Sequence, residues 1–126
     1  MLRKQTILLA DPDYAKHMSL ARLLKQDFEL LFAKDGIEAV RIYDKNVERV
    51  SAVIIDMHIP RLNGRAVSEW MLHIAPHLPI IITSDVLDEE ALDLCRHSTV
   101  SLMVEPIRPA AIKEFLLQGT SVVAGR

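Results

Sequence analysis

The sequence is poor in cysteine, and this absence excludes one class of small protein. Cys95 is the single cysteine among 126 residues, so a scaffold held together by disulfides is excluded. A chain of this length can bury a hydrophobic core without disulfides or structural metals, and its length predicts one domain. Cys95 lies within a helical pattern, and we interpret it as a small hydrophobic residue of the core.

The sequence also lacks an excess of positive charge. Its 15 Lys and Arg against 17 Asp and Glu give a formal net charge of -2 at pH 7. Domains that bind nucleic acid carry clustered basic residues, because much of their affinity comes from phosphate contacts. We therefore expect no direct contact between this domain and nucleic acid.

Long hydrophobic runs are absent as well. No window approaches the roughly 20 apolar residues that a membrane-spanning helix needs. The N-terminal stretch "MLRKQTILLADPD" has a basic start, but its apolar run is too short for a signal peptide and no small-residue cleavage pattern follows. Together with the lone cysteine, this predicts a cytoplasmic protein with no membrane contact.

Short apolar runs alternate with longer amphipathic segments along the whole chain. The apolar runs predict strands at 6–10, 29–33, 52–55, 79–83 and 100–104. The amphipathic segments predict helices at 14–26, 36–46, 64–74, 88–97 and 109–118. This alternation is typical of βαβ units with right-handed crossovers, so the sequence predicts an α/β fold: a doubly wound, five-stranded parallel sheet with helices on both faces.

Helix start signals support these boundaries. Asp13 and Asp88 stand at N-cap positions, and Pro109 stands at a first-turn position. The predicted domain therefore covers 1–118. Residues 119–126 are interpreted as a C-terminal tail or the start of a linker.

Acidic and hydroxyl side chains follow the predicted strands where those strands end. Asp11 follows the first strand, Asp56 the third, Ser84 the fourth and Glu105 the fifth. In doubly wound sheets this edge carries the ligand site, and Asp11 and Asp56 meet there if the first and third strands are neighbours. Paired carboxylates recruit a hard cation such as Mg²⁺. An aspartate beside such a cation is a competent nucleophile for a phosphoryl group, and a nearby serine could hydrogen-bond that group.

Four segments carry a family resemblance. The segments "ILLADPD", "VIIDMHIPRLNG", "PIIITS" and "VEPIRPAAI" resemble, in order and spacing, the receiver domain of two-component response regulators, over about residues 6 to 117. The resemblance implies a flavodoxin-like (βα)5 fold with strand order 2-1-3-4-5. It also implies a signalling domain rather than an enzyme, one that takes part in a phosphorelay and regulates an output domain or protein.

The resemblance further implies roles for individual residues. Asp56 would accept a phosphoryl group from a histidine kinase or phosphotransfer protein, with Mg²⁺ as cofactor. Asp11, Asp56 and the backbone carbonyl of His58 would bind the metal, with Asp13 as an additional candidate ligand that we prefer as a helix cap. Ser84 would sense the phosphoryl group.

Three positions depart from the family pattern. Pro12 stands where the family has a second acidic metal ligand, and Glu105 stands where it has a lysine, still followed by Pro106. Leu102 occupies the place of an aromatic residue on the family's output face. Glu105 adds a repulsive carboxylate to a site that must accommodate a phosphoryl group with nearly two negative charges. The cations expected to offset the charge of the phosphoryl group are Mg²⁺ and one of three basic side chains: Lys34, Arg61 or Arg108.

The remaining polar and apolar residues carry weaker expectations. His17, His73, His77 and His97 have no metal-ligand spacing and are expected on solvated faces. The first helix is expected to bury the stripe of Met18, Ala21 and Leu24. A face formed by the fourth helix, fifth strand and fifth helix, with Leu92, Cys95 and Leu102, would serve dimer or output contacts, although these residues equally suit the core.

Three other functions remain open from the sequence. A degenerate receiver would act as a phosphorylation-independent protein-interaction module. "ILLADPD" also resembles the start of haloacid-dehalogenase-like phosphatases, although a cap domain and a convincing downstream lysine are missing. A flavin-binding flavodoxin shares the fold but needs a Ser/Thr/Gly-rich phosphate loop after the first strand, which this chain lacks.

Overall fold

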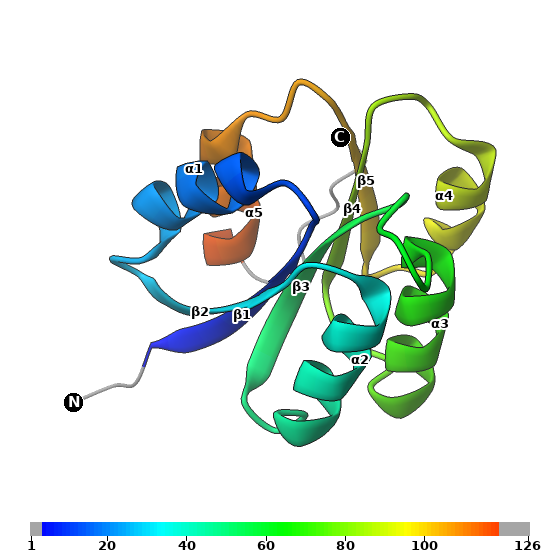
Figure 1. The fold of residues 1–126 in the computed structure, drawn as a ribbon, viewed down its shortest axis with the longest axis horizontal. Coiled ribbons are helices and arrows are strands. Elements are labelled where there is room, and N and C mark those ends of the chain that lie inside the picture. Colours follow the sequence, from blue (N-terminus) through cyan, green and yellow to red (C-terminus); the bar gives the residue numbers. More distant parts are fainter. Residues whose placement is uncertain (1–3, 119–126) are drawn as a thin grey trace.

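The computed structural model describes residues 4–118, and these form one parallel sheet flanked by helices (Figure 1). The predicted tail at 119–126 lies outside the described residues. The elements are β1 (Gln5–Ala10), α1 (Tyr14–Leu24), β2 (Phe28–Ala33), α2 (Gly36–Lys45), β3 (Val50–Asp56), α3 (Gly64–Ile74), β4 (Ile80–Ser84), α4 (Glu89–Leu94), β5 (Val100–Val104) and α5 (Pro109–Gln118). The strand order is β2-β1-β3-β4-β5 and all pairings are parallel. The predicted fold class and strand order are confirmed.

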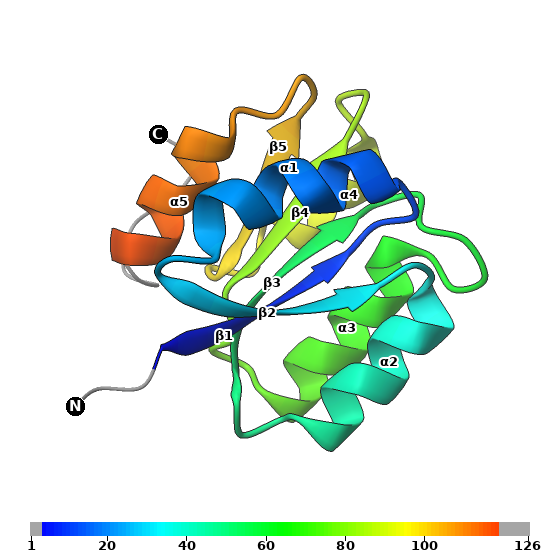
Figure 2. The same cartoon turned by 60° about the vertical axis from the view of Figure 1, so that its left-hand side comes forward.

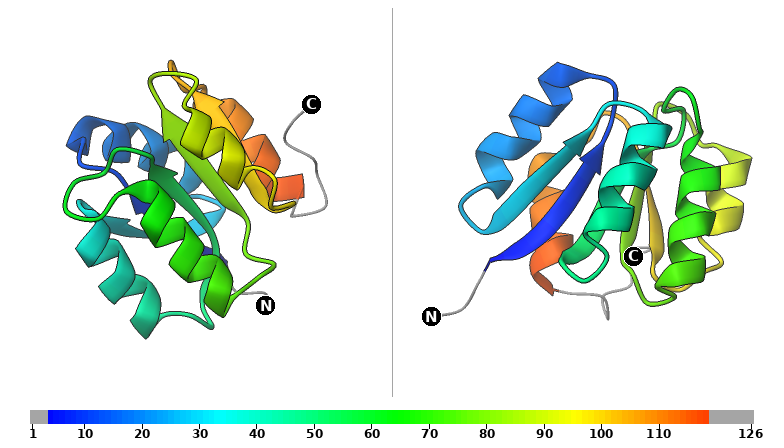
Figure 3. Two further views of the ribbon diagram at one scale, coloured as in Figure 1. Left: turned by 90° about the vertical axis from the view of Figure 1, so that its right-hand side faces the viewer. Right: turned by 60° about the horizontal axis from the view of Figure 1, so that its bottom comes forward.

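The helices divide between the two faces of the sheet. Figures 2 and 3 show α1 and α5 on one face and α2, α3 and α4 on the other. Alternate residues of β1 serve the two cores, because successive side chains of a strand point to opposite faces. Ile7 and Leu9 pack in the core beneath α1 and α5, whereas Leu8 and Ala10 pack in the core beneath α2, α3 and α4. The central strands are therefore buried on both faces, as their continuous apolar runs predict.

Two helices are shorter than their sequence patterns predict. α1 ends at Leu24, because Lys25 is its C-cap and the chain turns at once into β2. α4 ends at Leu94. After it, the amides of Arg96 and His97 donate to carbonyls three residues earlier, which is the tighter pattern of a closing turn.

The buried face of α1 is rotated from the predicted stripe. Met18 is 43% exposed, whereas His17 is buried and its ring centroid lies 5.0 Å from that of Phe32 on β2. Burial lowers the pKa of His17, the charges of Asp11 and Asp13 opposing it. The prediction of a solvated His17 was wrong. Histidine has an apolar ring body, which packs well once a neighbouring aromatic residue covers it.

Glycine is required where the β3–α3 loop crosses the start of α2. The amide of Gly36 donates to the carbonyl of Pro60 at 2.9 Å. A Cβ on Gly36 would lie 1.8 Å from the carbonyl oxygen of Leu62, which is far inside contact distance. Within the same loop, Arg61 adopts a left-handed conformation, with φ at 73°. The loop that follows Asp56 is therefore seated directly on the backbone of α2.

Candidate functional site

Asp11 and Asp56 lie together at the edge where β1 and β3 end. These strands are neighbours and pair in register up to Ala10 and Ile55, so the next residue of each strand is an aspartate at the same edge. Burial raises the pKa of Asp56 above its ordinary value of 3.8, and the nearby charge of Asp11 raises it further. The structure thus brings together the two carboxylates that the sequence predicts to meet.

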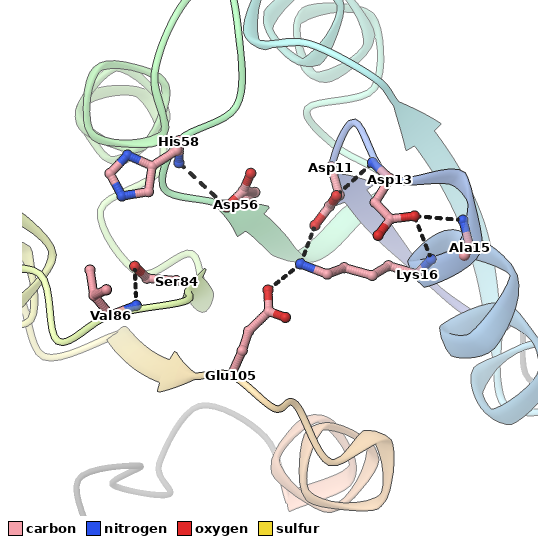
Figure 4. A network of polar contacts seen from close by, with 9 residues as sticks. All are labelled: Asp11, Asp13, Ala15, Lys16, Asp56, His58, Ser84, Val86 and Glu105. Carbon is pink, nitrogen blue, oxygen red and sulfur yellow. Dashed lines mark hydrogen bonds and ion pairs between the residues drawn. The ribbon is translucent and has the colours of Figure 1, made fainter.

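Backbone groups hold Asp56 in place. The amide of Met57 donates to the carbonyl of Thr83 on β4 at 2.8 Å, which fixes the end of β3 against β4. The amide of His58 lies 3.4 Å from Oδ1 of Asp56, as Figure 4 shows. This contact favours the charged carboxylate and partly opposes the effect of burial on its pKa.

Asp13 caps α1 through its side chain. Its Oδ1 accepts hydrogen bonds from the amides of Ala15 at 2.9 Å and Lys16 at 3.4 Å. The amide of Asp13 in turn donates to Oδ1 of Asp11 at 2.7 Å. The two aspartates on either side of Pro12 therefore have different tasks: Asp13 begins the helix, and Asp11 stands at the site.

The basic residue at the site is Lys16, which the sequence reasoning missed. Its ammonium group forms an ion pair with Glu105 and lies 3.6 Å from Oδ2 of Asp11 (Figure 4). Burial opposes protonation of Lys16, yet its hydrogen bond to Glu105 and the charge of Asp11 raise its pKa overall. The signal was its position: it is the third residue of a helix that begins at the site edge, where a long side chain can reach back over the strand ends.

The cations expected from the sequence do not occupy this position. Arg61 forms an ion pair at 3.7 Å with Asp35, the N-cap of α2. Among residues 4–118, neither Lys34 nor Arg108 forms an ion pair with a carboxylate of the site. The cation that pairs with Glu105 comes from α1 instead, and the prediction that one of these three offsets the charge of a phosphoryl group stays a prediction.

Ser84 and His58 link the site to the β4–α4 segment. Ser84 is fully buried at the end of β4, and its hydroxyl oxygen accepts from the amide of Val86 at 3.3 Å. The ring of the exposed His58 lies 3.3 Å from Asp88, the N-cap of α4. Neither side chain is bonded to the Asp56 carboxylate, but both connect its surroundings to the start of α4.

The donor set at this edge suits a magnesium ion. Among the described residues, no group of three or more His, Cys, Asp and Glu side chains is arranged to hold a metal. Mg²⁺ needs fewer protein ligands, because it keeps several waters and binds through one or two carboxylates together with phosphate oxygens. Asp11 and Asp56 provide such a pair of carboxylates.

Comparison with known proteins identifies the family. The family model for the response regulator receiver domain matches residues 7–116. The chain belongs to the response regulator receiver domain family. Receiver domains are signalling domains that interact with histidine kinases and output domains, and they generally bind Mg²⁺ at their phosphorylation site.

Individual relatives agree with this assignment. The chain is 35% identical over 77 residues to the response regulator MprA of three Mycobacterium strains, a match covering 60% of this chain and 33% of those proteins. It therefore aligns with about a third of their length. A receiver domain from Clostridium thermocellum is 25% identical with a TM-score of 0.79, covering 87% of this chain and 89% of that one. A structure titled adenylate cyclase from Rhodopirellula baltica is 26% identical with a TM-score of 0.83, covering 94% and 89%.

Leu102 and Cys95, two positions of the predicted output face, contact the core of this receiver domain. Leu102 on β5 is half-buried and packs with Cys95 against the core beneath α2, α3 and α4. Burial raises the pKa of the Cys95 thiol, which keeps it in its unreactive protonated form. Within residues 4–118, no helix is long and apolar enough to cross a membrane.

The raised pKa of Asp56 predicts a measurable effect on stability. A carboxyl group whose pKa is raised by folding lowers the free energy of unfolding. This loss of stability develops as the pH rises from 3.8 to the raised pKa, and it is complete at higher pH. We expect Asp56→Asn to raise the thermal midpoint of the metal-free protein at pH 7 by a few degrees, with the difference vanishing toward pH 3.8.

Thermal unfolding in buffer with a chelator, followed by circular dichroism between pH 3.5 and 7.5, measures this effect. Asp44→Asn, an exposed change on α2 with the same loss of charge, is the control and should leave the midpoint nearly unchanged. An Asp56→Asn variant that is less stable than the wild type at pH 7 would contradict the electrostatic explanation.

Proposed function

We propose that Asp56 accepts a phosphoryl group from a histidine kinase or phosphotransfer protein, and that the domain thereby regulates an output domain or protein partner. The observation that carries this proposal is the placement of Asp56. Its carboxylate is half-buried at the end of β3 beside Asp11. A carboxylate held in that way is a partly solvent-accessible nucleophile with a charged neighbour.

The transfer itself requires little from the protein beyond position and charge. One carboxylate oxygen of Asp56 attacks phosphorus, and the bond from phosphorus to the donor breaks. The leaving group keeps the electron pair, and a departing imidazole is then protonated on the nitrogen that held phosphorus. Asp56 must be ionised to attack phosphorus. A carboxylate with a raised pKa is more basic, and therefore more nucleophilic, once it is deprotonated at neutral pH.

Magnesium would be held by Asp11, Asp56 and the backbone carbonyl of His58. When bound, the metal neutralises the paired carboxylates and the phosphoryl oxygens. Asp13 is the weaker candidate ligand, because its Oδ1 caps α1. Pro12 offers no side-chain ligand, so the ion would depend more heavily on Asp11.

Ser84 is the group proposed to sense the phosphoryl oxygen. Its hydroxyl accepts from the amide of Val86 in this structure, and rotation toward a phosphoryl oxygen would break that contact. The β4–α4 segment would then rearrange, since it exposes Val86 and Leu87 and leads into α4. The face formed by α4, β5 and α5, which includes Leu102 and the exposed Leu92, is the proposed site of homodimer or output contacts.

Incubation with acetyl phosphate and MgCl₂ tests the proposed function. Intact mass spectrometry should detect the addition of one phosphoryl group, and the adduct should be labile to hydroxylamine as an acyl phosphate is. Borohydride reduction and peptide mapping should place it on Asp56. Omission of Mg²⁺ or addition of a chelator is the control and should strongly reduce uptake.

Asp11→Asn is expected to weaken Mg²⁺ binding. The change keeps the size of the side chain but removes one of the two neighbouring carboxylate charges that would hold the ion. We expect affinity to fall by at least about 10-fold, the lower bound typical for the loss of a supporting partner at a metal site. The Mg²⁺ dependence of the thermal midpoint measures this affinity directly, and Asp44→Asn should not change it.

One observation favours a second candidate function, a phosphorylation-independent interaction module. The ion pair of Lys16 with Glu105 joins α1 to the segment after β5 through side chains of the domain alone. If no phosphoryl group is taken up at any Mg²⁺ concentration, this interpretation replaces the first. Turnover of a chromogenic phosphomonoester that depends on Asp11 would instead support a phosphatase.

A further inference from the structure

Lys16 occupies a position that joins the two sides of the site. It lies in the first turn of α1, and its ammonium reaches Glu105, which is 89 residues away in the sequence and follows β5. The same ammonium lies 3.6 Å from Asp11. The side chain of Lys16 is 32% exposed, so solvent has access to the ion pair although most of the side chain is covered by protein.

The site carries more negative than positive side chains. Asp11, Asp56 and Glu105 bring three carboxylates to one edge of the sheet, and the positive charges of Lys16 and His58 both favour the ionised form of Asp56. Among the described residues, Lys16 is the only Lys or Arg within ion-pair distance of any of these three carboxylates. A phosphoryl group on Asp56 would add further negative charge at the same point.

We propose that Lys16 is the side chain that binds the phosphoryl group on Asp56, and that Glu105 is a positioning residue that holds Lys16 at the site beforehand. The inference rests on the proposed function of Asp56. Lysine suits this exchange, because its ammonium is a compact charge with three donors on a flexible four-carbon stem. One donor can leave Glu105 for a phosphoryl oxygen while Asp11 remains close.

The surroundings of the ion pair leave room for this exchange. A cavity of about 180 Å³ adjoins it, lined by Lys16 and Glu105 together with Thr83 and parts of α1 and the β5–α5 segment. The stem of Lys16 can therefore shift without displacing a packed side chain. Thr83 is the register partner of Asp56, so the cavity also borders the strand pair that carries the acceptor.

Glu105 has opposite effects with and without Lys16. Alone, its carboxylate would repel the phosphoryl group. Paired with Lys16, it is neutralised and keeps the ammonium close to Asp56 rather than in solvent. Loss of the Glu105 carboxylate should therefore lower the rate of phosphoryl uptake, even though a repulsive charge is removed. The decrease should be smaller than the one caused by loss of the Lys16 ammonium.

The test compares phosphoryl uptake and lifetime among charge variants under the acetyl phosphate conditions above. Lys16→Gln should change the phosphorylation of Asp56 by roughly 10-fold, either as a shorter half-life of the phosphate or as a lower rate of its formation. This is the size expected for loss of one hydrogen bond to a charged group. The pair Lys16→Glu with Glu105→Lys returns a cation to the site from β5 and should recover most of this loss, whereas Lys16→Glu alone should not. Arg22→Gln, which removes one exposed charge from the same helix, is the matched control.

A second measurement does not depend on the transfer of a phosphoryl group. The ammonium resonance of Lys16 in NMR spectra should shift on Glu105→Gln in the free protein. It should also shift when beryllium fluoride and Mg²⁺, a phosphoryl mimic, are added to the wild type. Circular dichroism of each variant verifies that the fold is retained.

The outcomes separate the inference from the function on which it rests. If the wild type takes up phosphate on Asp56 but Lys16→Gln behaves as Arg22→Gln does, the inference is overturned and the proposed function stands. If the wild type takes up no phosphate, both are overturned. An unchanged Lys16 resonance on addition of the phosphoryl mimic also refutes the inference.

Discussion

Replacement of Asp56 with asparagine is expected to abolish phosphoryl uptake while leaving the fold intact. Asparagine keeps the shape of the side chain and an oxygen that can accept from the amide of His58. It lacks the ionised oxygen that attacks phosphorus, so the acyl phosphate cannot form. Intact mass after incubation with acetyl phosphate should show no hydroxylamine-labile gain, against nearly complete modification of the wild type at saturating donor and Mg²⁺.

The stability measurement makes this loss interpretable. The same variant is expected to be more stable than the wild type at pH 7 without metal, because the buried charge beside Asp11 is gone. Loss of uptake with increased stability identifies a missing acceptor, and loss of uptake with lowered stability identifies a damaged fold. Residual phosphate on Asp56→Asn at the wild-type level would show that another side chain is the acceptor.

Gly36→Ala is expected to destabilise the domain more than Gly64→Ala would, because its Cβ meets the closer backbone contact. The new Cβ would lie 1.8 Å from the carbonyl oxygen of Leu62 and 2.7 Å from its carbonyl carbon. These are backbone atoms, so relief requires the β3–α3 loop to move, with loss of the hydrogen bond from Gly36 to Pro60. We expect a cost of about 3 kcal/mol, the upper part of the usual range for overpacking.

Chemical denaturation measures this cost. For a domain of this size the thermal midpoint should fall by about 10 °C. Arg41→Ala adds an alanine to an exposed position of the same helix and should change the midpoint little, because arginine and alanine are both good helix formers. A midpoint for Gly36→Ala within two degrees of the wild type would mean that the loop is not seated on α2.

This loop also connects stability to the site. It runs from Asp56 past His58 to the helix cap at Asn63 and packs on Gly36. A second glycine, Gly64, would place a Cβ 2.7 Å from the carbonyl oxygen of Asp56 itself. The two glycines therefore allow the chain after Asp56 to pack closely against the starts of α2 and α3.

The fold and the central acidic pair followed from the sequence. Alternating apolar and amphipathic segments predict βαβ units, and parallel strands must end at one edge, so Asp11 and Asp56 had to lie near each other once β1 and β3 were neighbours. Short-range rules also placed the caps, since Asp13 and Asp88 both accept from amides in the first turn of their helices. These features depend on periodicity and on local hydrogen bonding, which a sequence displays directly.

The cation of the site and the seat of the loop were decided by tertiary structure. Lys16 meets Glu105 across 89 residues of sequence, and a long flexible side chain can reach several partners, so no local pattern selects this one. In the same way, His17 is buried because Phe32 of a neighbouring strand covers its ring, and Gly36 is indispensable because Leu62 happens to cross it. Periodicity determines which elements form and which ends they share, but contacts between side chains distant in sequence depend on how those elements pack.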